Sequence, residues 1–140
     1  MYNVRATLIG LGSTFALVVM FEAIGAQIWH FTDGIDMNNK DAVRAALAHA
    51  PLVAMIYLIA SYGVAGLFGS FLARKMAGGI STRPSRTVAI GLLVACVFNT
   101  VTVPEPMWVS IASVLIPLPA AFLGMKLAAP KLVPSNIARG

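Results

Sequence analysis

One acidic side chain, Glu22, lies inside a long apolar stretch of this sequence. An ionised carboxylate within the hydrocarbon of a membrane costs on the order of 2–3 kcal/mol, so it has to face other helices or be protonated. A carboxylate held in that way can fix the register of the helices, or it can take up and release a proton or a cation. Both roles remain open for Glu22, as does a contact with a partner subunit.

Three other polar side chains are expected at a similar depth in the remaining apolar stretches: Tyr57, Asn99 and Ser113. We expect Glu22, Asn99 and Tyr57 to form one hydrogen-bonded cluster, because each would otherwise keep a polar group without a partner in apolar surroundings. Together with Ser113 they are the candidate intramembrane site for a proton or a cation.

Weaker candidates for chemistry lie between the first two apolar stretches. Imidazole and carboxylate groups can bind a transition metal, and this segment contains His30, His49, Asp33 and Asp36. Their spacing does not match that of a helical zinc site or a haem site, so we favour ordinary residues of the water interface and predict no metal or other cofactor. The single cysteine, Cys96, has no basic neighbour to activate its thiol. Since the sequence also contains no nucleophilic serine motif and no phosphate-binding loop, we do not expect an enzyme.

The composition indicates that these side chains belong to a membrane protein. Of the 140 residues, 59% are hydrophobic and 11% are charged, whereas soluble domains have roughly 45–50% and about 25%. Such a chain has too little polar surface to cover a water-soluble globule, and it is too hydrophobic to be disordered. The single cysteine excludes a disulfide framework within the chain.

Four apolar stretches are long enough to cross a membrane as helices, which takes about 20 residues each. They cover residues 6–31, 51–73, 87–103 and 107–125. The predicted fold class is therefore all-α: one domain over residues 1–140, formed by a bundle of four transmembrane helices. The first and second stretches differ from the third and fourth in length and polar content, so no inverted repeat is predicted.

The distribution of charge predicts the orientation of these spans. The N-terminus, the central connection and the C-terminus contain no acidic residue and eight basic ones: Arg5, Arg74, Lys75, Arg83, Arg86, Lys126, Lys131 and Arg139. The other two connections contain four acidic and two basic residues. Since basic residues concentrate on the cytoplasmic side, we expect both termini in the cytoplasm, in a bacterial inner membrane. The net charge of +5 therefore reflects topology and indicates no nucleic-acid partner.

The connections carry local signals of their own. Asn39 is a good helix cap before the strong helix formers of residues 40–50, which predicts a short helix ahead of the second span. Two prolines in the segment 104–106 predict a tight turn there. Residues 76–84 are rich in glycine and hydroxyl groups and predict a flexible loop, whose flanking cations determine topology and could also contact anionic lipid. Aromatic rings are expected at the outer interface, at Trp29, Phe31 and Trp108.

Small residues at four-residue spacing predict close contacts between helices. The two longest such ridges belong to the second and fourth spans and comprise Ser61, Ala65, Gly69 and Ala73, and Ala120, Gly124 and Ala128. Packing within one chain is the favoured interpretation, and a contact between copies is the alternative. Pro117 and Pro119 predict a kink near the middle of the last span, because each lacks the N–H that a helix needs.

Four short segments resemble a pattern found in small uncharacterised four-span bacterial membrane proteins. They are Phe21–Gly25, Gly34–Asp36, Pro106–Trp108 and Pro119–Ala121. In that pattern an early acidic residue is followed by an outer loop with a Gly-x-Asp sequence, and the final hairpin contains proline and tryptophan. This resemblance covers most of the chain and implies four spans, with no assigned function.

Residues 22–25 also resemble the glutamate-bearing first helix of the small multidrug resistance transporters. Those are four-span proteins that act as dimers, and their glutamate binds protons and cationic drugs in competition. The resemblance implies proton-coupled antiport through Glu22. This chain departs from that family in its greater length, its long acidic outer connection, the two prolines of its last span and its second and third helices, which do not match.

Two functions are predicted from these observations. The favoured one is a non-enzymatic integral membrane protein that acts through helix packing, as an accessory subunit of a larger membrane complex or as a homo-oligomer. It rests on the ridges of small residues and on the lack of a complete set of catalytic groups. The alternative is a small proton- or cation-coupled transporter or channel that uses Glu22. In both cases the expected partners are the lipid bilayer and other membrane-embedded chains.

Overall fold

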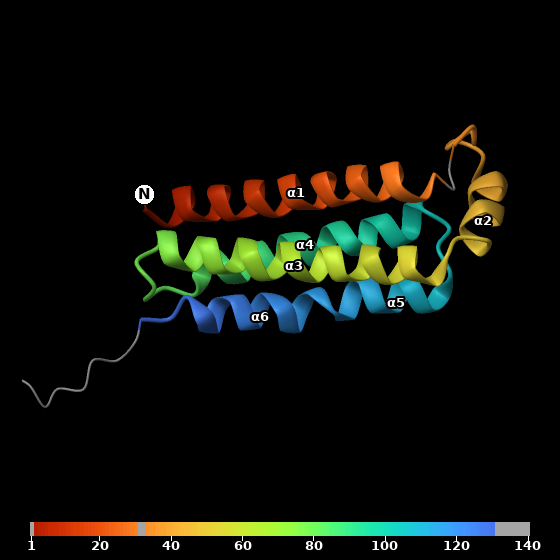
Figure 1. Ribbon diagram of the computed structural model, residues 1–140. Helices are drawn as coiled ribbons and strands as arrows, with labels where there is room; N and C mark the ends of the chain where they lie inside the picture. Colours follow the sequence, from red (N-terminus) through yellow and green to blue (C-terminus); the bar gives the residue numbers. More distant parts are fainter. Residues whose placement is uncertain (1, 31–32, 131–140) are drawn as a thin grey trace, which may run out of the picture.

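The computed structural model describes residues 2–30 and 33–130, and within them the chain forms six helices and no strands. Four segments are long and apolar enough to cross a membrane, and the last of these is made of two consecutive helices. The predicted fold class, an all-α protein with four candidate membrane spans, is therefore confirmed. The helices are α1 Tyr2–Trp29, α2 Lys40–Ala48, α3 Leu52–Met76, α4 Arg83–Thr102, α5 Met107–Leu115 and α6 Pro117–Leu127 (Figure 1).

The helices extend beyond some of the predicted spans. The first begins at Tyr2 instead of residue 6, and α4 begins at Arg83 instead of residue 87. Hydropathy detects only the part of a helix that lies in hydrocarbon, whereas backbone hydrogen bonding continues into the polar residues at its end.

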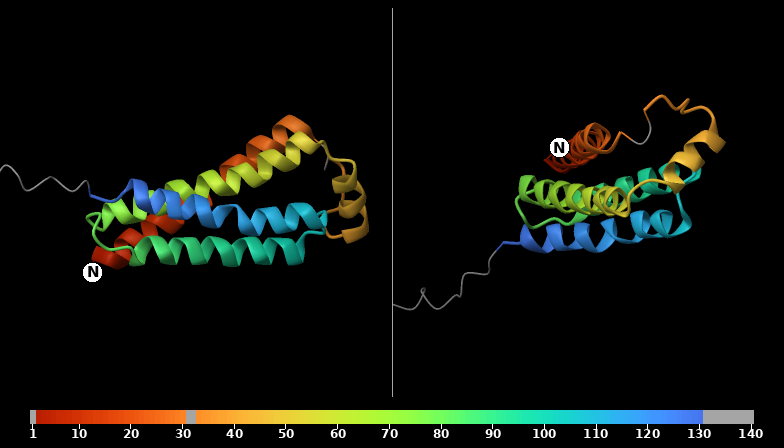
Figure 2. Two further views of the ribbon diagram at one scale, coloured as in Figure 1. Left: turned by 90° about the horizontal axis from the view of Figure 1, so that it is seen from below. Right: turned by 45° about the vertical axis from the view of Figure 1, so that its right-hand side comes forward.

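The third helix lies at the centre of the bundle and packs against α1, α4, α5 and α6 (Figures 1 and 2). Half of the most apolar window of α3 is buried, compared with 11% of that of α1. The start of α1 and the end of α6 lie at the same end of the bundle, as an even number of spans requires, and α2 lies at the other end (Figure 1).

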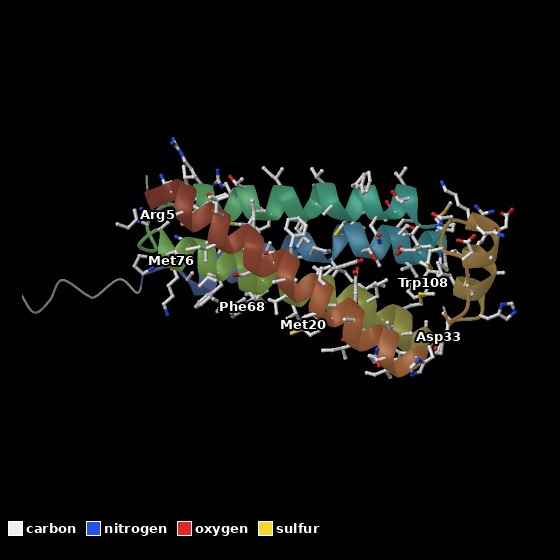
Figure 3. The ribbon with its side chains drawn as sticks, turned by 90° about the horizontal axis from the view of Figure 1, so that it is seen from above. Arg5, Met20, Asp33, Phe68, Met76 and Trp108 are labelled. Atoms are coloured by element: carbon white, nitrogen blue, oxygen red, sulfur yellow. The ribbon has the colours of Figure 1, made fainter. Side chains whose placement is uncertain are left out.

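The first helix diverges from α4 along its length. Its start, marked by Arg5 in Figure 3, lies beside the start of α4, and its far end, towards Asp33, lies away from α4. The two helices, α1 and α4, are therefore closest at the end of the bundle where both begin. Towards α2 they are further apart.

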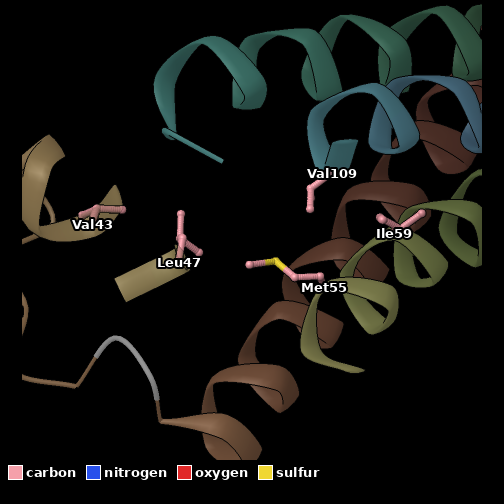
Figure 4. Packing of buried hydrophobic residues seen from close by; sticks show 5 residues of the cluster. All are labelled: Val43, Leu47, Met55, Ile59 and Val109. Carbon is pink, nitrogen blue, oxygen red and sulfur yellow. The ribbon is translucent and has the colours of Figure 1, made fainter. Parts of the chain in front are cut away.

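The short α2 closes the end of the bundle on that side. Asn39 caps it, because the Asn39 side chain accepts hydrogen bonds from the backbone N–H groups of Asp41 and Ala42. Its apolar side chains pack against α3 and α5 in a cluster of Val43, Leu47, Met55, Ile59 and Val109 (Figure 4). The helix predicted for residues 40–50 is thus observed at Lys40–Ala48.

Small side chains allow the closest helix contacts. All four small residues of the α3 ridge are buried: Ser61, Ala65, Gly69 and Ala73. A side chain on Gly69 would collide with Thr14 and with the carbonyl oxygen of Gly10, both on α1. On the other side of α3, a side chain on Gly124 would collide with the carbonyl oxygen of Leu67. Ala120 and Ala128 are half-buried.

The last span is interrupted at Ile116, between α5 and α6. Pro117 and Pro119 cannot donate the backbone hydrogen bonds of a continuous helix, which is the reason for the predicted kink.

The α3–α4 connection is held by hydrogen bonds instead of forming the flexible loop that the sequence predicts. The Arg74 guanidinium donates hydrogen bonds of 2.7 Å to the carbonyl oxygens of Gly79 and Met125, and Gly79 has a φ of +77°, which favours glycine.

Candidate functional site

Glu22 takes part in a chain of side-chain hydrogen bonds that joins three helices. Its Oε1 accepts a bond of 3.0 Å from the hydroxyl of Tyr62 on α3. The Tyr62 oxygen accepts a bond of 3.3 Å from Nδ2 of Asn99 on α4, and the same Nδ2 donates a bond of 3.1 Å to Oε1 of Glu105. Glu105 lies in the connection between α4 and α5. We call these four side chains the Glu22–Glu105 network.

The structure corrects one member of the expected cluster. Glu22 and Asn99 do lie together, but Tyr62 joins them instead of Tyr57. The Tyr57 hydroxyl donates a bond of 3.0 Å to the backbone carbonyl of Phe21, and its ring packs against Trp29 with the ring centres 5.0 Å apart. Tyr57 is therefore a neighbour of the network and is bonded to none of its members.

Ser113 is not part of this arrangement. It is buried on α5, where its Oγ has no hydrogen-bond partner among the described residues, and it lines neither of the cavities beside the network. The expectation that it shares a site with Glu22 is wrong, because Ser113 lies on a buried side of α5 and no hydrogen bond connects it to the network.

Two half-open cavities adjoin the network, in the space where α1 diverges from α4. One of about 170 Å³ continues along α1 and α4 between apolar side chains, and one of about 300 Å³ continues towards α2. Glu22, Tyr62 and Asn99 line both cavities, and Glu105 lines the larger one. The Glu22 side chain is exposed into this space, whereas Tyr62 is only 4% exposed.

The network contains two carboxylates and no basic side chain to balance them. No lysine or arginine lines either cavity, and His30, which lines the larger one, is paired with Asp33. The ion pairs found among the described residues, His30–Asp33 and Arg44–Asp41, lie on the exposed connection between α1 and α3. Two like charges in low-dielectric surroundings repel each other, so the arrangement favours the uptake of a positive charge.

Glu105 shows this imbalance most directly. Burial raises the pKa of its carboxyl, the hydrogen bond from Asn99 lowers it, and the nearby charge of Glu22 raises it, with a net shift upward from the ordinary value. Its second oxygen, Oε2, is buried and has no hydrogen-bond partner among the described residues. Glu105 therefore keeps its proton up to a higher pH than an exposed glutamate does.

Glu105→Gln is expected to reduce the loss of stability at higher pH. A group whose pKa is raised by folding contributes its full stability below the unfolded value of about 4.3, and that contribution is lost as the pH rises through the folded value. Glutamine keeps the oxygen that accepts from Asn99 but carries no charge. Thermal unfolding in detergent from about pH 4 to about pH 8 should show a steeper decline for the wild type. Parallel curves for the two proteins would contradict the raised pKa.

Of the four weak candidates for metal ligands, two lie in contact and the other two make separate local bonds. His30 pairs with Asp33 at 3.0 Å, whereas Nδ1 of His49 contacts the carbonyl oxygen of Ala45 at 2.8 Å. The Asp36 side chain accepts from the backbone of Asn38. Within the described residues no group of three or more histidine, cysteine or acidic side chains could hold a metal ion. Three residues named in the sequence analysis lie outside the described residues: Phe31, Lys131 and Arg139.

In chemical terms the Glu22–Glu105 network can hold and exchange a positive charge. It offers carboxylate oxygens at both ends, joined by a hydroxyl and an amide that can each change partners. Sequence reasoning missed Tyr62 and Glu105, although Tyr62 continues the face of α3 that carries the small residues. Comparisons with protein-family models, curated proteins and solved structures found no match to this chain.

Proposed function

We propose that this protein is a small proton- or cation-coupled transporter or channel that uses the Glu22–Glu105 network. One observation carries the proposal: two carboxylates joined by hydrogen bonds face a cavity that no lysine or arginine lines, and the histidine in its lining, His30, is paired with Asp33. A negative charge that lies between membrane spans without a counter-charge is costly, so a proton or a mobile cation is the natural occupant.

The shared donors couple the two carboxylates. Asn99 Nδ2 donates to both Tyr62 and Glu105, and the Tyr62 hydroxyl donates to Glu22. Neutralising one carboxylate weakens the hydrogen bond that it accepts and leaves the donor freer to serve the other end. Binding of a positive charge at one end is therefore felt at the other.

The proposed location is a bacterial inner membrane with both termini in the cytoplasm. This orientation is supported by the excess of basic residues at the end of the bundle that holds the N-terminus and the α3–α4 connection. In that orientation, the larger cavity and α2 face the outside, and a cation would reach Glu105 before Glu22.

Glu22→Gln tests the proposed transport. The purified protein is reconstituted into liposomes with a pH gradient and a trapped pH-sensitive dye, with sodium or potassium outside. The wild type is expected to dissipate the gradient, and Glu22→Gln to fall to the rate of protein-free vesicles. Asp36→Asn, which removes an exposed carboxylate on the outer connection, should match the wild type. Transport by Glu22→Gln with unchanged pH dependence would remove Glu22 from the mechanism.

A second candidate function is action through helix packing, as an accessory subunit or a homo-oligomer. The observation in its favour is α1, which the rest of the chain covers least and which presents small residues on an exposed face: Gly12, Ala16 and Ala23. Small residues allow another helix to approach closely.

Native mass spectrometry of the protein extracted gently from its own membrane tests this second candidate. A stoichiometric complex, either with another chain or with copies of itself, is the expected result. A monomer under conditions that preserve known complexes of the same membrane would contradict it. Transport by the purified protein alone would favour the first candidate over an accessory role.

A further inference from the structure

A third cavity lies at the other end of the bundle from the Glu22–Glu105 network. It is a groove of about 370 Å³ between the start of α1 and the start of α4. The polar part of its lining comprises Asn3, Thr7, Arg83 and Thr87, and the apolar part includes Val4 and Leu8. Figure 3 shows this end of α1, marked by Arg5, lying beside the start of α4.

The charge at this end of the molecule is positive. All five acidic residues of the chain belong to α1 beyond its middle or to the connections at the opposite end: Glu22, Asp33, Asp36, Asp41 and Glu105. The first turn of α4 contains no acidic residue, and Arg83 makes no ion pair with any part of the chain that the structure describes. The groove thus offers a guanidinium without a negative partner among the described residues.

Beyond the groove, exposed apolar side chains continue along the same face of α4. Arg83, Thr87, Ile90 and Val94 follow one another at helical spacing on one face of α4. Ile90 and Val94 are 60% and 63% exposed, and on the facing wall Leu8 is 63% exposed. A ligand that fits both parts has an anionic head and an apolar tail.

We propose that this groove binds an anionic phospholipid, with its phosphate at Arg83 and one acyl chain along Leu8, Ile90 and Val94. Guanidinium groups match the geometry of phosphate oxygens, so Arg83 is the donor to the phosphate. The hydroxyls of Thr7 and Thr87 already donate to the backbone carbonyls of Asn3 and Arg83 and add only polar surroundings. A free phosphate would use the polar end alone, whereas the exposed apolar walls below it favour a lipid. The site is independent of the proposed transport, because none of its lining residues belongs to the Glu22–Glu105 network.

Native mass spectrometry with added lipid tests the proposal. The full-length protein, purified in detergent, is titrated with phosphatidylglycerol or with phosphatidylcholine of the same acyl chains. The wild type should bind phosphatidylglycerol more tightly, and Arg83→Gln should weaken that binding about fivefold. Arg5→Gln is the matched control, since it removes the same charge at the same end of the bundle, from a residue of α1 that does not line the groove. It should bind as the wild type does.

Three results would overturn the proposal. Equal binding of the two lipids would show that the groove does not select a negative head, and equal losses in Arg83→Gln and Arg5→Gln would show a general effect of charge. Displacement of the lipid by millimolar inorganic phosphate would show that the free anion is the ligand.

Ile90→Ser tests the apolar part of the site. This variant should weaken binding of long-chain phosphatidylglycerol but leave binding of a short-chain form unchanged. All variants are compared only after each elutes as the wild type does in size-exclusion chromatography.

Discussion

Gly124→Ala is expected to destabilise the bundle by about 3 kcal/mol, near the upper end of the costs measured for overpacking a well-packed interior. The Cβ of an alanine at this position would collide with the carbonyl oxygen of Leu67 on α3. That neighbour is a backbone atom within a helix and cannot rotate away, so α6 has to move as a whole. A loss of this size is a large fraction of the roughly 5–15 kcal/mol that holds a typical domain together.

Gly63→Ala is the matched control for this prediction. It places the same methyl group in the contact between α3 and the last span, but its nearest neighbours are side-chain atoms of Ile116 and Ala120 at 3.4 and 3.9 Å. Those are ordinary contact distances, and alanine favours a helix over glycine by roughly 1 kcal/mol. Unfolding in mixed micelles with increasing dodecyl sulfate, followed by circular dichroism, should therefore rank Gly124→Ala far below the wild type and Gly63→Ala level with it. Equal stability of the two variants would contradict the close contact of α6 with α3.

The architecture could be predicted from the sequence because each span is continuous in hydropathy. In lipid a backbone has to satisfy its own hydrogen bonds, so four long apolar stretches leave little choice but four helices. Local signals were sufficient as well for α2, where Asn39 supplies the cap, and for the break of the last span at Pro117. The hydrogen bonds by which Arg74 fixes the α3–α4 connection could not be predicted. One of their acceptors, the carbonyl oxygen of Met125, belongs to α6, which is distant in the sequence.

The identity of the tyrosine in the site depends on how α3 is rotated about its axis. Successive residues of a helix are about 100° apart, so Tyr57 points roughly 120° away from the mean direction of Ala65, Gly69 and Ala73. Tyr62 points within about 20° of that direction. Tyr62 therefore lies on the face of α3 that α1 approaches at Gly10 and Thr14. Tyr57 also contacts α1, but at Phe21 and Trp29 instead of Glu22. The helical spacing between Tyr62 and these small residues is visible in the sequence, whereas depth in the membrane does not distinguish the two tyrosines.

Glu105 could not be assigned to the site by such a pattern. Its position between two prolines predicts a turn, and a short connection between α4 and α5 is found there. The turn brings its carboxylate back over the end of α4, to 3.1 Å from Asn99, and this depends on the path of three residues in space. A second carboxylate near Glu22 is the feature that changes the favoured function from helix packing to the binding of a positive charge.

Tyr62→Phe should therefore be more harmful to transport than any other removal of a single hydroxyl. Phenylalanine preserves the packing of the ring but deprives Glu22 of its donor and Asn99 of one acceptor. Hydrogen bonds to charged groups contribute about 1.5–3 kcal/mol, so the rate of cation-driven dissipation of a pH gradient should fall by roughly tenfold or more. Reconstituted vesicles, loaded as for Glu22→Gln, give the measurement.

Tyr57→Phe is the control that separates the network from its surroundings. It removes one hydroxyl from the same helix and from the lining of the same larger cavity, but that hydroxyl bonds only to the backbone carbonyl of Phe21. A neutral bond of this kind is worth about 1 kcal/mol to stability and touches neither carboxylate, so transport should change by less than about twofold. If both variants slow transport equally, the tyrosines act by shaping the cavity, and the chain from Glu22 to Glu105 does not carry the coupling. If only Tyr62→Phe slows transport, the positive charge binds to the hydrogen-bonded network itself.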